Sequence, residues 1–151
     1  MLTEASYVDS DVFILPLLGE RSSRSSGARR ALEQIEAGTL TAYTSVLTWD
    51  EVARVVSEVL GRTDGLRAGR KLLNFPHLRF VDASASVIAR AQAISEESGL
   101  APRDAIHCAT ASGKGIRRFI SDDRAIESIP EIERVPLESF AAEGGPPKSL
   151  D

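Results

Sequence analysis

Carboxylate side chains occur in four separate segments of this sequence, close to the ends of apolar stretches. These acids are Asp9, Asp11, Glu51, Asp104, Asp122 and Asp123. Carboxylates packed together repel one another, and their pKa values rise unless a cation neutralises them. Mg²⁺ and Mn²⁺ prefer oxygen ligands and can activate a water for attack at phosphorus. If folding gathers the acids, the chemistry they predict is metal-dependent hydrolysis of phosphate esters.

Short strands alternating with helices would position these acids. The pattern predicts strands over Ser6–Val8, Leu40–Ser45, Leu78–Val81, Arg118–Ser121 and Val135–Leu137. It predicts helices over Asp11–Leu18, Ala28–Glu36, Asp50–Leu60, Leu66–Leu73, Ser84–Ser98, Pro102–Ser112 and Asp122–Ile126, with a loop over Gly19–Gly27. This alternation indicates a three-layer α/β/α fold with a mostly parallel central sheet. Ligands of such sheets gather at the carboxyl ends of the strands, where several of the acids fall.

Most of the acids also have a purely structural explanation. Thr48 and Glu51 have the spacing of a capping box, in which Glu51 would bond back to the helix N-terminus. Asp104 would lie in a first helical turn, where the macrodipole favours an acid. Either acid after Ser121 could cap a short helix. Asp9 is the hardest to explain in this way, because a carboxylate directly after an apolar strand risks burial and needs a partner.

Histidine and cysteine offer fewer possibilities. Cys108 is the single cysteine and there are two histidines, so a zinc site of the usual Cys/His kind cannot be assembled within one chain. Cys108 is expected to be a small buried residue. His107 lies three residues after Asp104, on the same helical face, and is interpreted as a packed or hydrogen-bonded residue.

Composition limits the class of protein. The chain of 151 residues fits one domain, which we place at residues 1–141, and the Gly- and Pro-containing segment 142–151 is expected to be a disordered tail. Eighteen basic against twenty-two acidic residues lack the basic excess of a general nucleic-acid binder. The N-terminus lacks a signal-peptide pattern, and the apolar run Val12–Leu18 is too short to cross a bilayer. We therefore expect a soluble cytoplasmic protein without a membrane partner.

Four motifs together resemble those of the PIN-domain nucleases. They are Tyr7–Phe13, Ser45–Arg54, Leu100–Ala111 and Phe119–Ile126, in the order and spacing of that family, and the likeness extends over Tyr7–Leu137. The compact size resembles the VapC-type toxins of toxin–antitoxin pairs. The resemblance implies a Mg²⁺- or Mn²⁺-dependent endoribonuclease that acts on RNA, is commonly a homodimer, and is inhibited by a cognate antitoxin.

The resemblance also implies roles for individual residues. The catalytic, metal-holding acids would be Asp9, Glu51, Asp104 and Asp123; Asp11, Ser121 and Asp122 would support them, and Arg103 and Arg124 would contact the RNA backbone. The sequence departs from the family at Asp11, where Asn is usual and where the acid could add charge or accept a hydrogen bond. The neighbouring Asp122 leaves the fourth acid open, although the family spacing favours Asp123. Ile126 replaces the usual aromatic residue.

Two other functions fit parts of the pattern. Asp9-Ser10-Asp11 is also the D-x-D of haloacid-dehalogenase-like phosphatases, in which Asp9 would be a covalent nucleophile. That alternative leaves Asp104 without a role. A PIN-like binding module that has lost activity is the non-enzymatic alternative, and the intact set of acids argues against it. No phosphate-binding glycine motif is present.

Overall fold

The structure is a computed structural model, and it describes residues 4–141. Its centre is a five-stranded sheet in the order β3-β2-β1-β4-β5, with every neighbouring pair parallel. The strands are β1 (Ser6–Val8), β2 (Ala42–Ser45), β3 (Leu78–Val81), β4 (Arg118–Ile120) and β5 (Glu133–Val135). The predicted tail lies outside the described residues.

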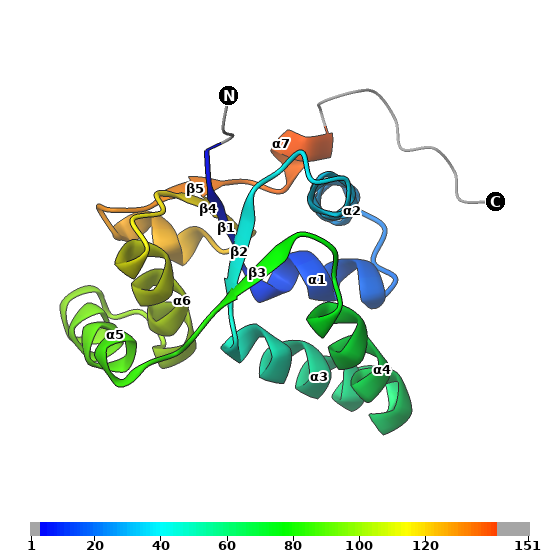
Figure 1. Cartoon of the computed structure of the whole chain (residues 1–151), viewed down its shortest axis with the longest axis horizontal. Coiled ribbons are helices and arrows are strands. Elements are labelled where there is room, and N and C mark those ends of the chain that lie inside the picture. Colours follow the sequence, from blue (N-terminus) through cyan, green and yellow to red (C-terminus); the bar gives the residue numbers. More distant parts are fainter. Residues whose placement is uncertain (1–3, 142–151) are drawn as a thin grey trace.

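Helices cover both faces of the sheet, which confirms the predicted three-layer α/β/α architecture (Figure 1). They are α1 (Ser10–Leu17), α2 (Ser23–Glu36), α3 (Leu47–Leu60), α4 (Arg62–Leu73), α5 (Ala85–Ser98), α6 (Pro102–Gly113), the 3₁₀ helix η1 (Arg124–Ser128) and α7 (Glu138–Ala141). Helices α5 and α6 pack on one face, and α1, α2 and the α3–α4 pair on the other. Within residues 4–141, no helix has the length and apolar character needed to span a bilayer.

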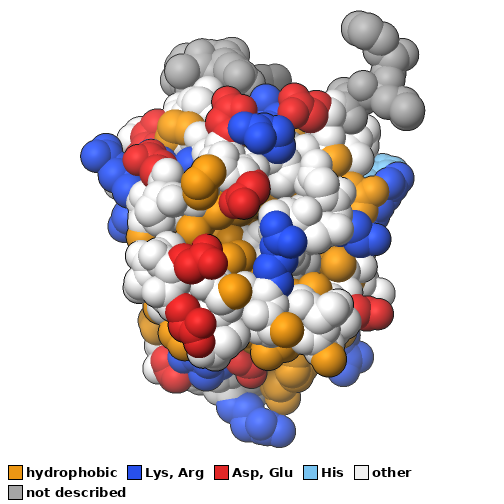
Figure 2. All heavy atoms as spheres, turned by 90° about the vertical axis from the view of Figure 1, so that its left-hand side faces the viewer, with side chains coloured by type: hydrophobic (Ala, Val, Ile, Leu, Met, Phe, Trp, Pro, Cys, Tyr) orange, Lys and Arg blue, Asp and Glu red, His pale blue; other side chains and the backbone are white. Residues whose placement is uncertain are grey.

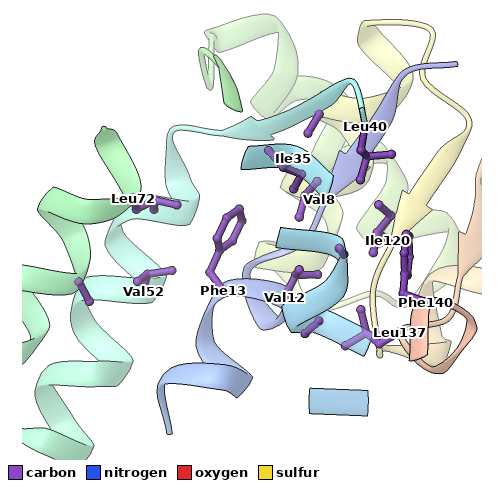
Figure 3. Close-up of a cluster of buried hydrophobic side chains, with 14 of the residues drawn as sticks. Val8, Val12, Phe13, Ile35, Leu40, Val52, Leu72, Ile120, Leu137 and Phe140 are labelled. Atoms are coloured by element: carbon purple, nitrogen blue, oxygen red, sulfur yellow. The ribbon is translucent and has the colours of Figure 1, made fainter. Parts of the chain in front are cut away.

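The core is divided by the sheet into two apolar clusters. Successive side chains of a strand point to opposite faces, so Tyr7 packs toward α6 and Val8 toward α1. On the α6 side, the ring of Tyr7 stacks on Phe119 of β4 with 4.8 Å between centroids. Figure 3 shows the opposite cluster, in which Val8 lies near Val12 and Ile120. The central strand β1 is buried on both faces, as expected for the middle of a parallel sheet.

The predicted loop over Gly19–Gly27 is wrong in its second half, because α2 already begins at Ser23. The Ser22 hydroxyl accepts a hydrogen bond from the Ser25 amide at 3.1 Å and so caps the helix. Gly27 lies where α2 passes the backbone before α7, and a Cβ there would be 1.7 Å from the Leu137 carbonyl oxygen. The polar, Ser- and Arg-rich composition suggested a loop, but the Ser22 cap starts a helix, and Gly27 lets that helix pass close to the Leu137 backbone.

Several other boundaries differ from the prediction; for example, α3 begins at Leu47 rather than Asp50, and α4 at Arg62 rather than Leu66. The last strand is Glu133–Val135 rather than Val135–Leu137, because Leu137 turns into the core below α2. The short helix after Ser121 starts two residues later than expected and is a 3₁₀ helix. The helix beginning at Pro102 is confirmed, with proline at its first position, where its missing N–H removes no helical bond.

Candidate active site

Asp9 lies at the carboxyl end of β1 and is 6% exposed. Its Oδ1 accepts a hydrogen bond from the Ser10 amide at 2.8 Å, so Asp9 is the N-cap of α1. Its Oδ2 accepts a hydrogen bond from the Ser121 hydroxyl at 2.7 Å, at the end of the adjacent strand β4. The prediction that this carboxylate would be buried and partnered is confirmed; its capping role was not anticipated.

Asp11 lies behind Asp9 and receives hydrogen bonds from the β4 end. The Ser121 hydroxyl lies 3.3 Å from Asp11 Oδ2, and the Asp122 amide donates to the same oxygen at 2.9 Å. Burial, followed by the charge of Asp9, raises the pKa of Asp11 well above its ordinary value. Its second oxygen, Oδ1, is buried and has no hydrogen-bond partner among the described residues. Asp11 therefore accepts hydrogen bonds, one of the two roles expected for it.

Glu51 faces Asp9 from the first turns of α3, but the predicted capping box is wrong. One Glu51 oxygen bonds to Nε2 of His107, and the other accepts from the Ser10 hydroxyl at 2.9 Å. The Thr48 hydroxyl bonds to Thr44 Oγ1 at 2.7 Å instead of capping the helix. Burial alone would raise the pKa of Glu51, but the bonds from His107 and Ser10 outweigh it and lower that pKa. Glu51 is therefore held as a carboxylate.

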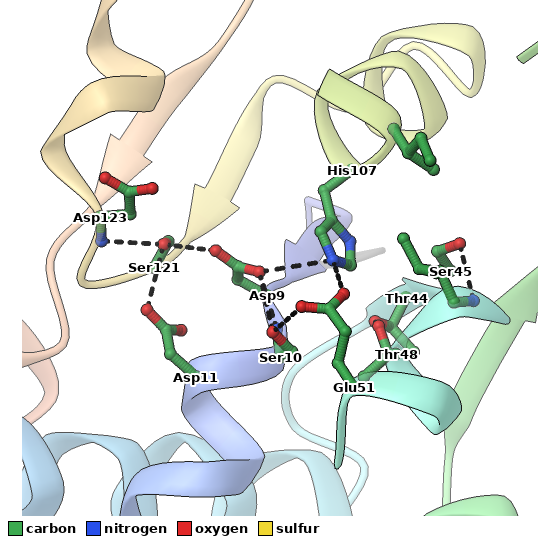
Figure 4. Close-up of polar contacts among 12 residues, drawn as sticks. Asp9, Ser10, Asp11, Thr44, Ser45, Thr48, Glu51, His107, Ser121 and Asp123 are labelled. Carbon is green, nitrogen blue, oxygen red and sulfur yellow. Dashed lines mark hydrogen bonds and ion pairs between the residues drawn. The ribbon is translucent and has the colours of Figure 1, made fainter. Parts of the chain in front are cut away.

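His107 projects from α6 and is buried, 1% exposed, against Tyr7 of β1 and Glu51 of α3. Its Nδ1 lies 2.5 Å from the Tyr7 hydroxyl oxygen. Figure 4 shows the other side of the ring, where Nε2 contacts Glu51 and lies 3.7 Å from Asp9 Oδ1. Burial opposes a charge on the imidazole, but the bond to Glu51 and the charge of Asp9 outweigh it and raise the pKa of His107. The expectation of a hydrogen-bonded histidine is confirmed. The helical face that His107 shares with Asp104 was the one sign in the sequence that His107 would lie near the acids.

Asp104 and Asp123 are the remaining two predicted acids, and each influences the other. Asp104 lies in the first turn of α6, where the charges of Asp123 and Asp9 both act on its carboxyl. Burial, then the charges of Asp123 and Asp9, raises the pKa of Asp104 to about 6. Asp123 also caps η1, as expected for one acid of its pair, because its carboxylate accepts from the Ala125 amide at 2.9 Å.

The Asp122 side chain is held by a basic residue of α2. Its carboxylate pairs with Arg24 of α2 at 2.7 Å, and that arginine also pairs with Glu20 at 2.6 Å. The charge of Asp123, by contrast, acts on Asp104, and the Asp123 amide donates to the Ser121 hydroxyl at 3.0 Å. The geometry therefore distinguishes Asp123 from Asp122, the two candidates for the fourth acid between which the sequence did not decide.

The arginines expected near the acids lie on the surface. Arg103 is 3.7 Å from Asp50 in an exposed ion pair, and Arg124 is exposed at the start of η1. Figure 2 shows the face covered by α5 and α6, on which acidic and basic side chains are interspersed without a continuous basic surface.

The acids suit a hard divalent cation in chemistry. Their donors are carboxylate oxygens, which Mg²⁺ and Mn²⁺ prefer. Within residues 4–141, no ion pair joins a lysine or arginine to Asp9, Asp104 or Asp123. In the same range, no three His, Cys, Asp or Glu side chains are arranged as a formed metal-binding group. The carboxylate donors, and the lack of a lysine or arginine beside these three acids in residues 4–141, fit a cation, although the side chains are turned toward protein partners.

Residues 6–132 match the PIN domain family. Because this match covers most of the chain, the protein belongs to the PIN domain family. The matched segment contains all the acids described above. No curated protein sequence matches the chain.

Solved structures share the fold. A toxin–antitoxin complex from Klebsiella pneumoniae aligns with a TM-score of 0.62 and 22% identity, covering 87% of this chain and 97% of that chain. DNA-bound VapBC from Salmonella typhimurium aligns with a TM-score of 0.66 and 15% identity, covering 89% and 99%. Mycobacterium tuberculosis VapC20, described as a sarcin–ricin loop cleaving toxin, aligns with a TM-score of 0.62 and 18% identity, covering 84% and 98%. At these identities the similarity establishes the fold.

Proposed function

We propose that this protein is a metal-dependent endoribonuclease that hydrolyses RNA phosphodiesters. The observation that carries this proposal is the approach of Asp9, Asp104 and Asp123, which come from three separate segments, without a lysine or arginine partner in the described part of the chain. Clustered carboxylates are costly unless they serve a cation or a reaction. PIN family membership supports a nuclease.

Mg²⁺ or Mn²⁺ would be held by Asp9, Asp104 and Asp123, with Glu51 as the fourth acid. When bound, such an ion activates a water and offsets charge developing on a phosphoryl oxygen. The protein's own contribution is to orient the ligands. Ser121 supports the site by donating to Asp9 at 2.7 Å.

Asp11 and Asp122 would act behind these ligands. Asp11 accepts hydrogen bonds from the Ser121 hydroxyl and from the Asp122 amide, which fixes the end of β4 beside Asp9. The Asp122 side chain would anchor the same segment to α2 through Arg24 rather than bind the ion. This division supports Asp123, not Asp122, as the metal-binding acid.

RNA is the proposed substrate, and Arg103 and Arg124 are the proposed backbone contacts. Both arginines are exposed at helix starts close in sequence to Asp104 and Asp123. Contacts from isolated arginines would position phosphates without reading the base sequence. The similarity to VapC20, a sarcin–ricin loop cleaving toxin, supports RNA as the substrate class.

We further propose that the protein is the toxin of a type II toxin–antitoxin system, with a cognate antitoxin as partner, and that it works in the cytoplasm as a homodimer. The similarity to toxin–antitoxin complexes from Klebsiella pneumoniae and Salmonella typhimurium supports the antitoxin. A small open reading frame beside the gene would add support.

The two alternatives have less in their favour. The phosphatase alternative would use Asp9 as a nucleophile, but membership of the PIN domain family leaves no observation that favours it. It predicts phosphate monoesterase activity and a trapped aspartyl-phosphate. An inactive binding module would need none of the acids, yet all four lie at one end of the sheet, close to Asp9.

Cleavage of structured and single-stranded RNAs in Mn²⁺ tests the proposal. Asp9→Asn and Asp104→Asn should each lower the cleavage rate by about a thousandfold, because each removes a charged ligand needed in the transition state. Asp64→Asn is the matched control, because Asp64 is an exposed acid in the first turn of α4 whose carboxylate lies 3.5 Å from Arg67, a residue without a proposed role. The control should cleave at nearly the wild-type rate, and a chelator should abolish cleavage. Equal cleavage by all four proteins would overturn the proposed site.

A further inference from the structure

A continuous line of hydrogen bonds runs from the backbone of β2 to Glu51. The Ser45 amide donates to the Tyr7 hydroxyl at 3.1 Å, that hydroxyl lies 2.5 Å from His107 Nδ1, and His107 Nε2 contacts Glu51. Tyr7, Ser45 and His107 are each at most 1% exposed. Because the line begins at a strand backbone and passes through buried groups, it has little freedom to move.

The hydrogen between His107 and Glu51 can be assigned from chemistry. A carboxylate can only accept, so Nε2 of the imidazole carries the hydrogen that faces Glu51. This holds for the neutral Nε2 tautomer and for the imidazolium alike. The Tyr7 hydroxyl already accepts from the Ser45 amide, and it can donate to or accept from Nδ1. The orientation of Glu51 therefore does not depend on the charge of the imidazole.

The second oxygen of Glu51 is also held. It accepts from the Ser10 hydroxyl at 2.9 Å, and the Ser10 amide donates to Asp9 Oδ1 at 2.8 Å. Nε2 of His107 lies 3.7 Å from that same Asp9 oxygen. His107 and Ser10 together hold Glu51 and Asp9 side by side, although two carboxylates alone would separate.

We propose that His107, braced by Tyr7, is a positioning residue that holds Glu51 against Asp9 for metal binding. This inference rests on the proposed function. His107 itself need not touch the ion or the RNA. Groups that orient metal-binding carboxylates typically affect metal affinity by about 10- to 100-fold. The packing and the hydrogen-bonding contributions of His107 can be separated by substitution.

Two polar substitutions differ in how far the amide nitrogen reaches. In His107→Gln the amide nitrogen is as many bonds from Cβ as Nε2 of histidine, so it can still donate to Glu51. In His107→Asn the amide nitrogen is only as far from Cβ as Nδ1, near Tyr7, and cannot reach Glu51. Cys108→Ala is the matched control for stability, because Cys108 is a buried neighbour on α6 without a bond to the acids.

The test measures the Mn²⁺ dissociation constant by calorimetry and the melting temperature of each full-length variant. We expect His107→Asn to weaken Mn²⁺ binding by about tenfold or more, and His107→Gln by less than about threefold. Cys108→Ala should lower the melting temperature and leave Mn²⁺ binding unchanged. Wild-type affinity in His107→Asn, or affinity losses that simply follow melting temperature across all variants, would overturn this inference alone. Absence of Mn²⁺ binding by the wild type would overturn the proposed function together with it.

Discussion

The two sides of the candidate site differ in how their acids are compensated. On one side, both oxygens of Glu51 have partners, in His107 and Ser10. On the other side, the charges of Asp123 and Asp9 act on Asp104 more strongly than that of His107 does. The consequence is visible in the pKa values, since that of Glu51 is lowered whereas that of Asp104 is raised to about 6.

This difference indicates that the two sides contribute differently to metal binding. The Glu51 side is completed by the protein itself and contributes rigidity, because its groups are buried and bonded. The Asp104 side is left short of positive charge, which a bound cation would supply. A site of this kind is costly to the apoprotein and is stabilised by its ligand.

The largest effect on stability is expected on the bonded side. Tyr7→Phe should lower the free energy of unfolding by about 2 kcal/mol, because it leaves the buried Ser45 amide and His107 Nδ1 without their partner. Tyr43→Phe is a matched control, since Tyr43 is the register partner of Tyr7 and bonds at the surface to Arg79. The control should cost less than about 0.5 kcal/mol. Urea denaturation of both variants measures this, and equal losses would contradict the comparison.

A smaller effect, of opposite sign, is expected on the Asp104 side. The pKa of Asp104 is raised from 3.8 to about 6 in the folded protein, so ionising it destabilises the fold. The cost is absent below the unfolded pKa, grows through the window between the two values, and is complete above pH 6. Asp104→Asn removes it, and solvent screening of this half-exposed group limits the gain to about 1 kcal/mol.

The measurement is unfolding in a chelator from pH 4.5 to pH 8. Asp104→Asn should gain stability over the wild type as the pH rises, and the gain should level off above pH 6. Added Mg²⁺ should reverse the order, because only the wild type keeps the full set of ligands. A pH-independent difference would show that Asp104 is not held under strain by its neighbours.

Local pattern predicted most of the fold. Strand–helix alternation predicted all five strands, and the parallel sheet followed from it. The failure at Ser23–Gly27 has a partly tertiary cause, because Gly27, at the end of the predicted loop, is needed where α2 passes the Leu137 backbone. Single-sequence patterns do not contain that contact.

For the site, the sequence predicted the positions of the acids better than their hydrogen-bond partners. The positions of Asp9, Asp104 and Asp123 follow from strand ends and helix starts, which local pattern reveals. The partners of Glu51 did not follow, because Thr48 and Glu51 matched a local capping box and the competing bond comes from His107 on a distant helix. The sequence indicated a place near the acids for His107 only through its helical spacing from Asp104. Nothing in the sequence distinguished Tyr7 from an ordinary core tyrosine.

The central claim is that the acids at the carboxyl ends of the strands hold a divalent cation. Anomalous scattering from a crystal of the full chain grown with Mn²⁺ tests it most directly. We predict a manganese peak bounded by carboxylate oxygens of Asp9, Asp104 and Asp123, at about the 2.1 Å expected for a small hard cation. The carboxyl of Glu51, still bonded to His107, should reach the ion directly or through a water. A crystal that cleaves RNA on dissolution but shows manganese elsewhere, or none, would contradict the account.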